Sequence, residues 1–155
     1  MDAQQADALF DRAVVLWNAR DFHGAHEDWE TLWNEEEGVR RDWLQGLIQY
    51  AAALFHADRG FYASGFVKLM RSARAKVEAH DASAERIRFD LLLRDLDAWH
   101  QHAAAVETGA DLVRGRPPWP SIRWREGVVP APAPPEPDDG EGEGNGGEGG
   151  EGGGA

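Results

Sequence analysis

The sequence predicts an all-α protein, a bundle of about five helices with a docked Pro/Trp segment and a disordered acidic, glycine-rich tail. Before Arg116, apolar residues recur at steps of three and four, as they do on one face of a helix. The stretches that connect these segments are short, which favours antiparallel neighbours in a bundle. We therefore expect one helical domain over residues 1–125 and a disordered Pro/Gly/Glu tail over residues 126–155, which has nothing to bury.

The first two predicted helices are amphipathic. Asp21 is the expected N-cap of a second helix over about residues 22–36, and Gly38 lies just beyond its end. The first helix precedes this cap and places six apolar residues on one face: Ala6, Leu9, Phe10, Ala13, Leu16 and Trp17.

The third predicted helix, over about residues 40–58, is apolar nearly all round and should be the central one. Gly60 ends it, and a fourth helix follows over about residues 61–80. Asp81 or Ser83 is the expected cap of a fifth helix. Its apolar seam consists of Phe89, Leu92, Leu93, Leu96, Trp99, Ala103 and Val106. The prolines of residues 117–124 exclude a helix there, but two tryptophans and an isoleucine predict that this segment packs on the bundle.

The composition of the chain limits which partners and which kinds of site are expected. The net charge is −12, and eight of the acidic residues but no Lys or Arg follow Arg125, so nucleic acid and anionic membrane surfaces are not expected partners. The absence of cysteine excludes disulfides, thiolate zinc sites and cysteine nucleophiles. The N-terminal residues do not resemble a signal peptide, and the longest apolar run, Trp43 to Phe55, is too short to span a bilayer. We expect a cytoplasmic protein, and whether it forms a homo-oligomer is left open.

The candidate site lies on the second predicted helix. His26 and Glu30 are one turn apart at the edge of its apolar arc, where they could hydrogen-bond to each other or hold one metal ion. The run His-Glu-x-x-Glu differs from the zinc-protease pattern His-Glu-x-x-His at the residue that would be the second ligand, Glu30. The sequence therefore does not predict a zinc protease.

The third predicted helix offers a complementary polar stripe made of Arg41, Gln45, Gln49 and His56. Polar groups on a buried helix need partners, because an unpaired one costs roughly 1–3 kcal/mol. We therefore expect a pocket between the two helices. Its predicted lining consists of His26, Glu30, Gln49 and His56, with Glu27, Trp29, Trp33, Arg41, Gln45 and Tyr50 around them.

Residues 21–33 and 44–56 resemble the family called domain of unknown function 309, helical proteins of bacteria and archaea. The family's hallmark, His-x-x-x-Glu-x-x-Trp, is met by His26, Glu30 and Trp33. The likeness covers about residues 5–80 and is weaker at 117–122. Metal binding has been suggested for this motif, so the resemblance implies His26 and Glu30 as candidate ligands. It implies no established activity.

Two function classes follow. The first is a protein that binds a divalent metal ion or a small ligand at His26, Glu30 and His56. One form of it is a metal-assisted hydrolase in which Glu27 or Glu30 acts as the base. The second is a protein-interaction or scaffold module in which His26 and Glu30 form a buried hydrogen-bonded pair that ties the second helix to the third. Whether the chain is an enzyme is left open.

Overall fold

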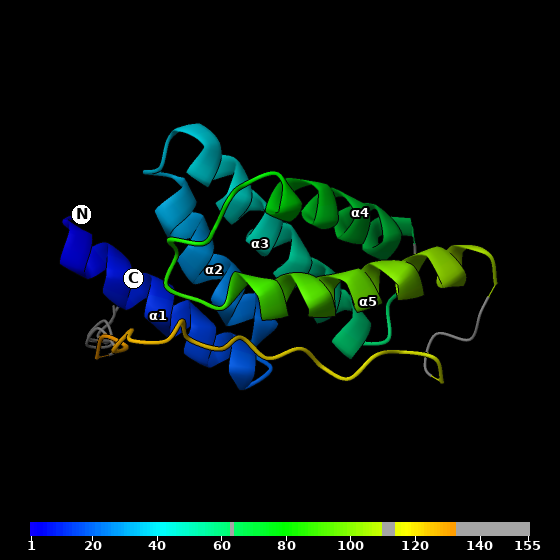
Figure 1. Cartoon of the computed structure of the whole chain (residues 1–155). Helices are drawn as coiled ribbons and strands as arrows, with labels where there is room; N and C mark the ends of the chain where they lie inside the picture. The colour runs from blue at the N-terminus through cyan, green and yellow to red at the C-terminus, as the bar shows by residue number, and fades with distance from the viewer. Residues whose placement is uncertain (63, 110–113, 133–155) are drawn as a thin grey trace, which may run out of the picture.

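The computed structural model describes residues 1–62, 64–109 and 114–132. Within these ranges it contains five helices and no strand, with one isolated bridge between Ile87 and Trp124. The all-α bundle is therefore confirmed (Figure 1). None of these helices is both long and apolar enough to cross a membrane. The helices are α1 (Ala3–Asn18), α2 (Phe22–Trp33), α3 (Gly38–Asp58), α4 (Ser64–Glu78) and α5 (Phe89–Glu107).

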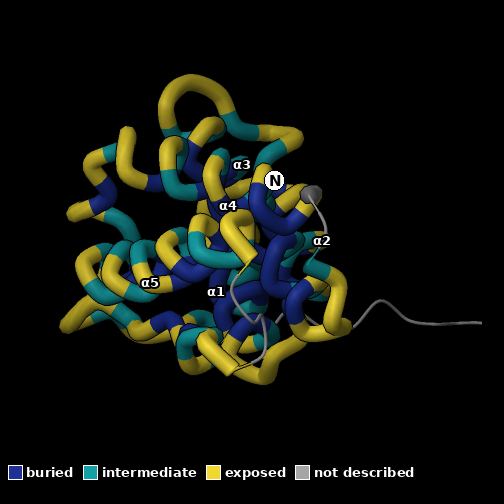
Figure 2. The backbone as a smooth tube through the Cα atoms, turned by 90° about the vertical axis from the view of Figure 1, so that its right-hand side faces the viewer, coloured by how far each residue is buried: buried dark blue, intermediate teal, exposed yellow. Residues whose placement is uncertain are grey.

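As predicted, α3 is central, because it packs against both α2 and α4, whereas α1 packs on α2 and α5 on α4. Figure 2 shows the buried residues of the chain gathered between the helices and the exposed ones on the outside. Aromatic rings fill much of this core, so the helices are held by large apolar contact areas. The largest fully buried side chains include Trp17, Trp29, Trp43, Trp99, Tyr50, Phe10 and Phe22.

The N-terminal ends of the first two helices follow the local rules for capping. Asp2 and Gln5 form a reciprocal capping box on α1, and the Asp21 carboxylate accepts from the backbone N–H of Gly24 at 2.9 Å, which confirms Asp21 as the N-cap of α2. The prediction was wrong at the other end of α2, which finishes at Trp33 rather than near residue 36. Residues 35–37 are all glutamate, and negative charge is unfavourable at a helix C-terminus. Gly38 takes a positive φ as the first residue of α3.

The fourth and fifth helices also begin later than predicted. α4 starts at Ser64 rather than near residue 61. α5 starts at Phe89, so neither Asp81 nor Ser83 caps it; the Asp81 carboxylate instead accepts from the backbone N–H of Ser83 inside a turn. The residues just before α5 are extended because they pair with the segment after residue 120. Their backbone bonds run from Arg88 N to Arg123 O and from Arg125 N to Arg86 O.

The Pro/Trp segment docks on the bundle through buried indoles and backbone carbonyls. The Trp17 indole N–H donates to the carbonyl of Pro120 at 3.0 Å, and the Trp99 indole N–H donates to that of Pro118 at 3.1 Å. Asn18 exchanges two hydrogen bonds with the backbone of Ile122. The predicted docking of this segment is therefore confirmed.

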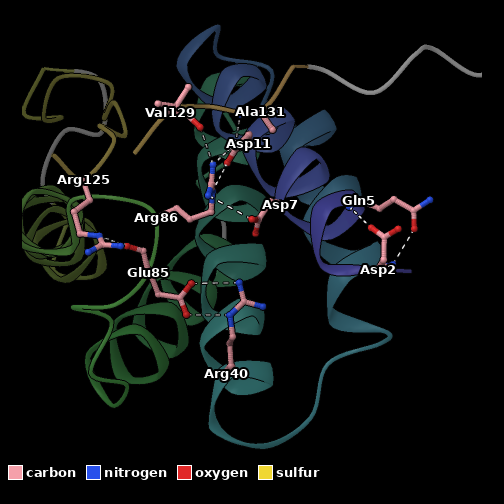
Figure 3. Close-up of polar contacts among 10 residues, drawn as sticks. All are labelled: Asp2, Gln5, Asp7, Asp11, Arg40, Glu85, Arg86, Arg125, Val129 and Ala131. Atoms are coloured by element: carbon pink, nitrogen blue, oxygen red, sulfur yellow. Dashed lines mark hydrogen bonds and ion pairs between the residues drawn. The ribbon is translucent and has the colours of Figure 1, made fainter. Parts of the chain in front are cut away.

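Contacts with α1 continue past Arg125, the predicted end of the domain. Asp11, only 1% exposed, accepts from the Arg86 guanidinium at 2.7 and 2.9 Å and from the backbone N–H of Ala131 at 2.6 Å (Figure 3). Arg86 also donates to the carbonyl of Val129 at 3.2 Å. Disorder was predicted over residues 126–155. Residues 126–132 of this stretch are described, and residues 133–155 lie outside the described residues.

Candidate functional site on the edge of α2

Helix α2 has an inner face and a polar outer edge. Phe22, Ala25 and Trp29 are buried in the core. Because a helix turns once every 3.6 residues, four polar side chains of this helix fall together along one side of this face. We call these four residues the α2 edge: His23, His26, Glu27 and Glu30.

The α2 edge consists of two His–Glu pairs, each one turn apart. Nε2 of His26 lies 3.5 Å from Oε2 of Glu30, and these side chains are 27% and 51% exposed. Nε2 of His23 lies 3.1 Å from Oε1 of Glu27, and both of these side chains are more than half exposed. The two imidazole rings stack with their centroids 6.0 Å apart. The edge therefore has an inner, half-buried pair and an outer, solvent-exposed pair.

The inner pair does not tie α2 to α3. Among the residues that the structure describes, His26 and Glu30 contact each other, and no hydrogen bond joins either side chain to α3. In the same part of the chain, the buried Nδ1 atom of His26 has no hydrogen-bond partner, nor has the indole Nε1 of Trp33, two turns further along. The sequence hypothesis of an interhelical hydrogen-bonded pair therefore finds no support in the geometry.

Trp33 and Arg41 make the contact between the end of α2 and the start of α3. The Arg41 guanidinium carbon lies 3.8 Å from the centroid of the Trp33 ring, and Arg41 Nε donates to the Trp33 carbonyl at 3.3 Å. This carbonyl belongs to the last turn of α2, where a cation is favourable. Arg41 thus satisfies the helix end and stacks on the third residue of the motif.

The rest of the polar stripe on α3 is not joined to the α2 edge. The side-chain oxygen of Gln49 accepts from the Ser72 hydroxyl of α4 at 2.8 Å, so Gln49 is directed toward α4. His56 is exposed and its ring lies beside that of Phe55, whereas Gln45 is half-buried. The predicted pocket placed the Gln49 side chain toward α2, and this hydrogen bond gives it a partner on α4.

Trp29 and Tyr50, predicted as pocket walls, belong to the core. Both are fully buried, and their rings lie 5.6 and 4.8 Å from that of Trp17. Burial raises the pKa of the Tyr50 phenol well above its usual value, and the charge of Asp95 adds to this. The phenol therefore stays protonated at neutral pH.

A metal ion would find two ligands here. Within the described ranges, no three His, Asp or Glu side chains are grouped so that they could hold a metal ion. His26 and Glu30 are therefore not joined by His56, and Glu27 contacts His23 instead. Structural zinc sites use four protein ligands and catalytic sites three, so the residues do not fit either type. They fit only a two-ligand site.

Sequence reasoning missed the buried carboxylate inside the motif itself. Asp28 is buried and accepts from the Arg12 guanidinium at 2.6 and 2.7 Å. The signal was available, because Asp28 lies three residues after Ala25 and four before Leu32, on the apolar face. An acid at such a position needs a cationic partner, and here that partner lies on α1.

Comparison with known proteins agrees with the resemblance seen in the sequence. No curated protein and no solved structure matches the chain. A family model described as "Domain of unknown function (DUF309)" matches residues 10–69, which run from α1 through α2 and α3 into α4 and include the whole α2 edge. Residues 10–69 are thus similar to this family.

Proposed function

We propose that the chain is a binding protein that takes a divalent transition-metal ion reversibly at His26 and Glu30. The observation that carries the proposal is the 3.5 Å separation between Nε2 of His26 and Oε2 of Glu30 in a pair whose imidazole is only 27% exposed, whereas both side chains of the outer pair, 3.1 Å apart, are more than half exposed. Two donor atoms that share one zinc ion, each about 2.1 Å from it, lie roughly 3–3.5 Å apart. Imidazole nitrogen with carboxylate oxygen is a donor set that suits Zn²⁺ and its neighbours.

The two-ligand geometry favours binding over catalysis. An ion held by two side chains of one helix leaves its other coordination positions to solvent or to a partner, so it exchanges readily. The metal-assisted hydrolase is not supported, because Glu27, one of its two predicted bases, contacts His23 at 3.1 Å rather than the inner pair. The other predicted base, Glu30, serves as a ligand in this proposal.

A scaffold role for the motif is the second candidate. The stacking of Arg41 on Trp33 supports it, because that contact joins α2 to α3 without any ligand. In this alternative His26 contributes to packing, and its loss lowers stability without changing the affinity for any metal.

Calorimetric titration of the full chain with zinc chloride separates the two candidates. We expect wild type to bind one ion, and H26A and E30Q each to weaken binding by roughly tenfold or more, because each removes a direct ligand. H23A and E27Q are matched controls that alter the outer pair of the same edge. They should keep the wild-type affinity.

Two results contradict the metal proposal. One is a wild-type chain that binds no zinc; the other is equal weakening by the inner and outer variants, which indicates only general attraction to acidic residues. A zinc-free wild type combined with an H26A variant that unfolds at lower temperature supports the scaffold role.

A further inference from the structure

The corner between α1 and α2 contains an arginine in a conformation that favours glycine. Arg20 has φ = 65°, and in the described part of the chain every other residue with positive φ is a glycine. The backbone N–H of Arg20 donates to Trp17 and that of Asp21 to Leu16, as in a common helix-ending motif whose left-handed position usually holds glycine. A residue with an L side chain is strained in this left-handed conformation. Such strain points to a functional role for the Arg20 side chain.

The Arg20 side chain meets a second arginine over one indole. The guanidinium carbon of Arg20 lies 4.6 Å from the centroid of the Trp119 ring, and that of Arg116 lies 4.5 Å from it. Trp119 itself is fixed from behind, because it stacks on Trp99 at 5.3 Å and packs on Phe22 at 5.8 Å. Two cations from distant parts of the sequence therefore converge on one rigid aromatic support.

The charges at this corner are not balanced. Arg20 forms an ion pair with Asp58, in which both side chains are partly exposed. Arg116 donates to the carbonyl of Pro117 at 3.0 Å and, among the residues that the structure describes, pairs with no carboxylate. Among the described residues, Arg20 thus has one carboxylate partner and Arg116 has none, in a protein whose net charge is −12.

We propose that Arg20 and Arg116 form a binding site for the phosphate group of a small phosphorylated molecule. Guanidinium groups present several N–H donors in a plane and bind oxyanions through paired, charge-assisted hydrogen bonds. Stacking on Trp119 holds the two groups in place before the anion arrives, which lowers the entropy cost of binding. This site shares no residue with the α2 edge and does not depend on the proposed metal binding.

The test is a titration of the full chain with inorganic phosphate, at constant ionic strength set by sodium chloride, followed by NMR at the Trp119 indole N–H. Wild type should show a saturable shift. R116Q should bind at least about tenfold more weakly, because one charged donor group is lost. R123Q removes one positive charge from an exposed residue of the same segment and should bind like wild type.

R20G separates binding from folding. Glycine adopts this φ without strain, so the variant should melt no lower than wild type and still lose about tenfold in phosphate affinity. The proposal is overturned if R20G and R116Q bind phosphate like wild type, or if R123Q weakens binding as much as they do. Equal affinity for acetate overturns the assignment to phosphate, in favour of a general carboxylate site.

Discussion

Two helical carboxylates, Asp11 on α1 and Glu30 on α2, show opposite uses of the same chemical group. Asp11 is buried and accepts hydrogen bonds from Arg86 and Ala131, which lie far from it in the sequence. Glu30 is half exposed, and the side-chain contact that it makes among the described residues is with His26, one turn away in its own helix. A carboxylate that holds this fold is therefore saturated by fixed donors, whereas the one at the motif has accepting positions that no described donor fills.

The same contrast exists within α2. Asp28 faces α1 and accepts two hydrogen bonds from Arg12, whereas the carboxylate of Glu27 on the outer edge is paired, within the described ranges, with His23 alone. Neighbouring acidic residues of one helix thus belong to two different environments, and the helical period decides which is which.

The largest expected effect is at Asp11. D11N keeps the side-chain volume but leaves Arg86 without its buried counter-charge, and an amide replaces a carboxylate that accepts from the backbone of residue 131. Since breaking a buried pair costs about 3–5 kcal/mol, and Arg86 is partly exposed, we expect a loss of about 3 kcal/mol in the free energy of unfolding. Urea denaturation followed by tryptophan fluorescence measures this loss.

D7N is the matched control for D11N. Asp7 contacts the same guanidinium at 3.4 Å but is half exposed, so its loss should cost less than about 1 kcal/mol. If D7N and D11N lost equal free energy of unfolding, Asp11 would not be the carboxylate that fixes the segment around Ala131 to α1.

Sequence reasoning succeeded where the interactions are local. The period of apolar residues placed the five helices, Asp21 was recognised as a cap, and the spacing of His26 and Glu30 placed them one turn apart. Each of these features depends on residues within about one turn, for which the backbone geometry is fixed.

It failed where the outcome depends on how helices are rotated or paired across the sequence. Gln49 was predicted to face α2, but its side chain has a hydrogen-bond partner on α4. The partner of Asp11 lies 75 residues away, and nothing in the pattern around Asp11 identifies it. Two helix boundaries were missed for a related reason. The end of α2 at residue 33 depends on the run of glutamates that follows it, and the start of α5 at residue 89 depends on backbone pairing with the docked segment.

A smaller effect is expected at Glu30. E30Q removes the carboxylate of an exposed intrahelical pair, and such pairs contribute less than about 0.5 kcal/mol. The free energy of unfolding of metal-free protein should therefore stay within about 0.5 kcal/mol of wild type, as should that of E27Q. A loss in E30Q comparable to that in D11N would place Glu30 among the residues that hold the fold, and would remove the distinction between the two carboxylates.

The smallest effect concerns an exposed carboxylate that is nevertheless well paired. Asp90, in the first turn of α5, accepts from the Arg88 guanidinium at 2.9 and 2.8 Å, and these hydrogen bonds lower its pKa from 3.8 to about 2. Because the folded pKa lies below the unfolded one, the pair stabilises the fold above pH 3.8 and loses that contribution as pH falls toward 2.

Thermal denaturation between pH 5 and pH 2 checks this last prediction. D90N should lose less stability than wild type over the lower part of this range, because it has no proton to gain there. Asp90 is exposed, so the difference should be slight and should shrink with added salt. Identical pH profiles for the two proteins would show that ion pairing at an exposed helix start adds nothing here, and that only enclosed carboxylates such as Asp11 stabilise this fold.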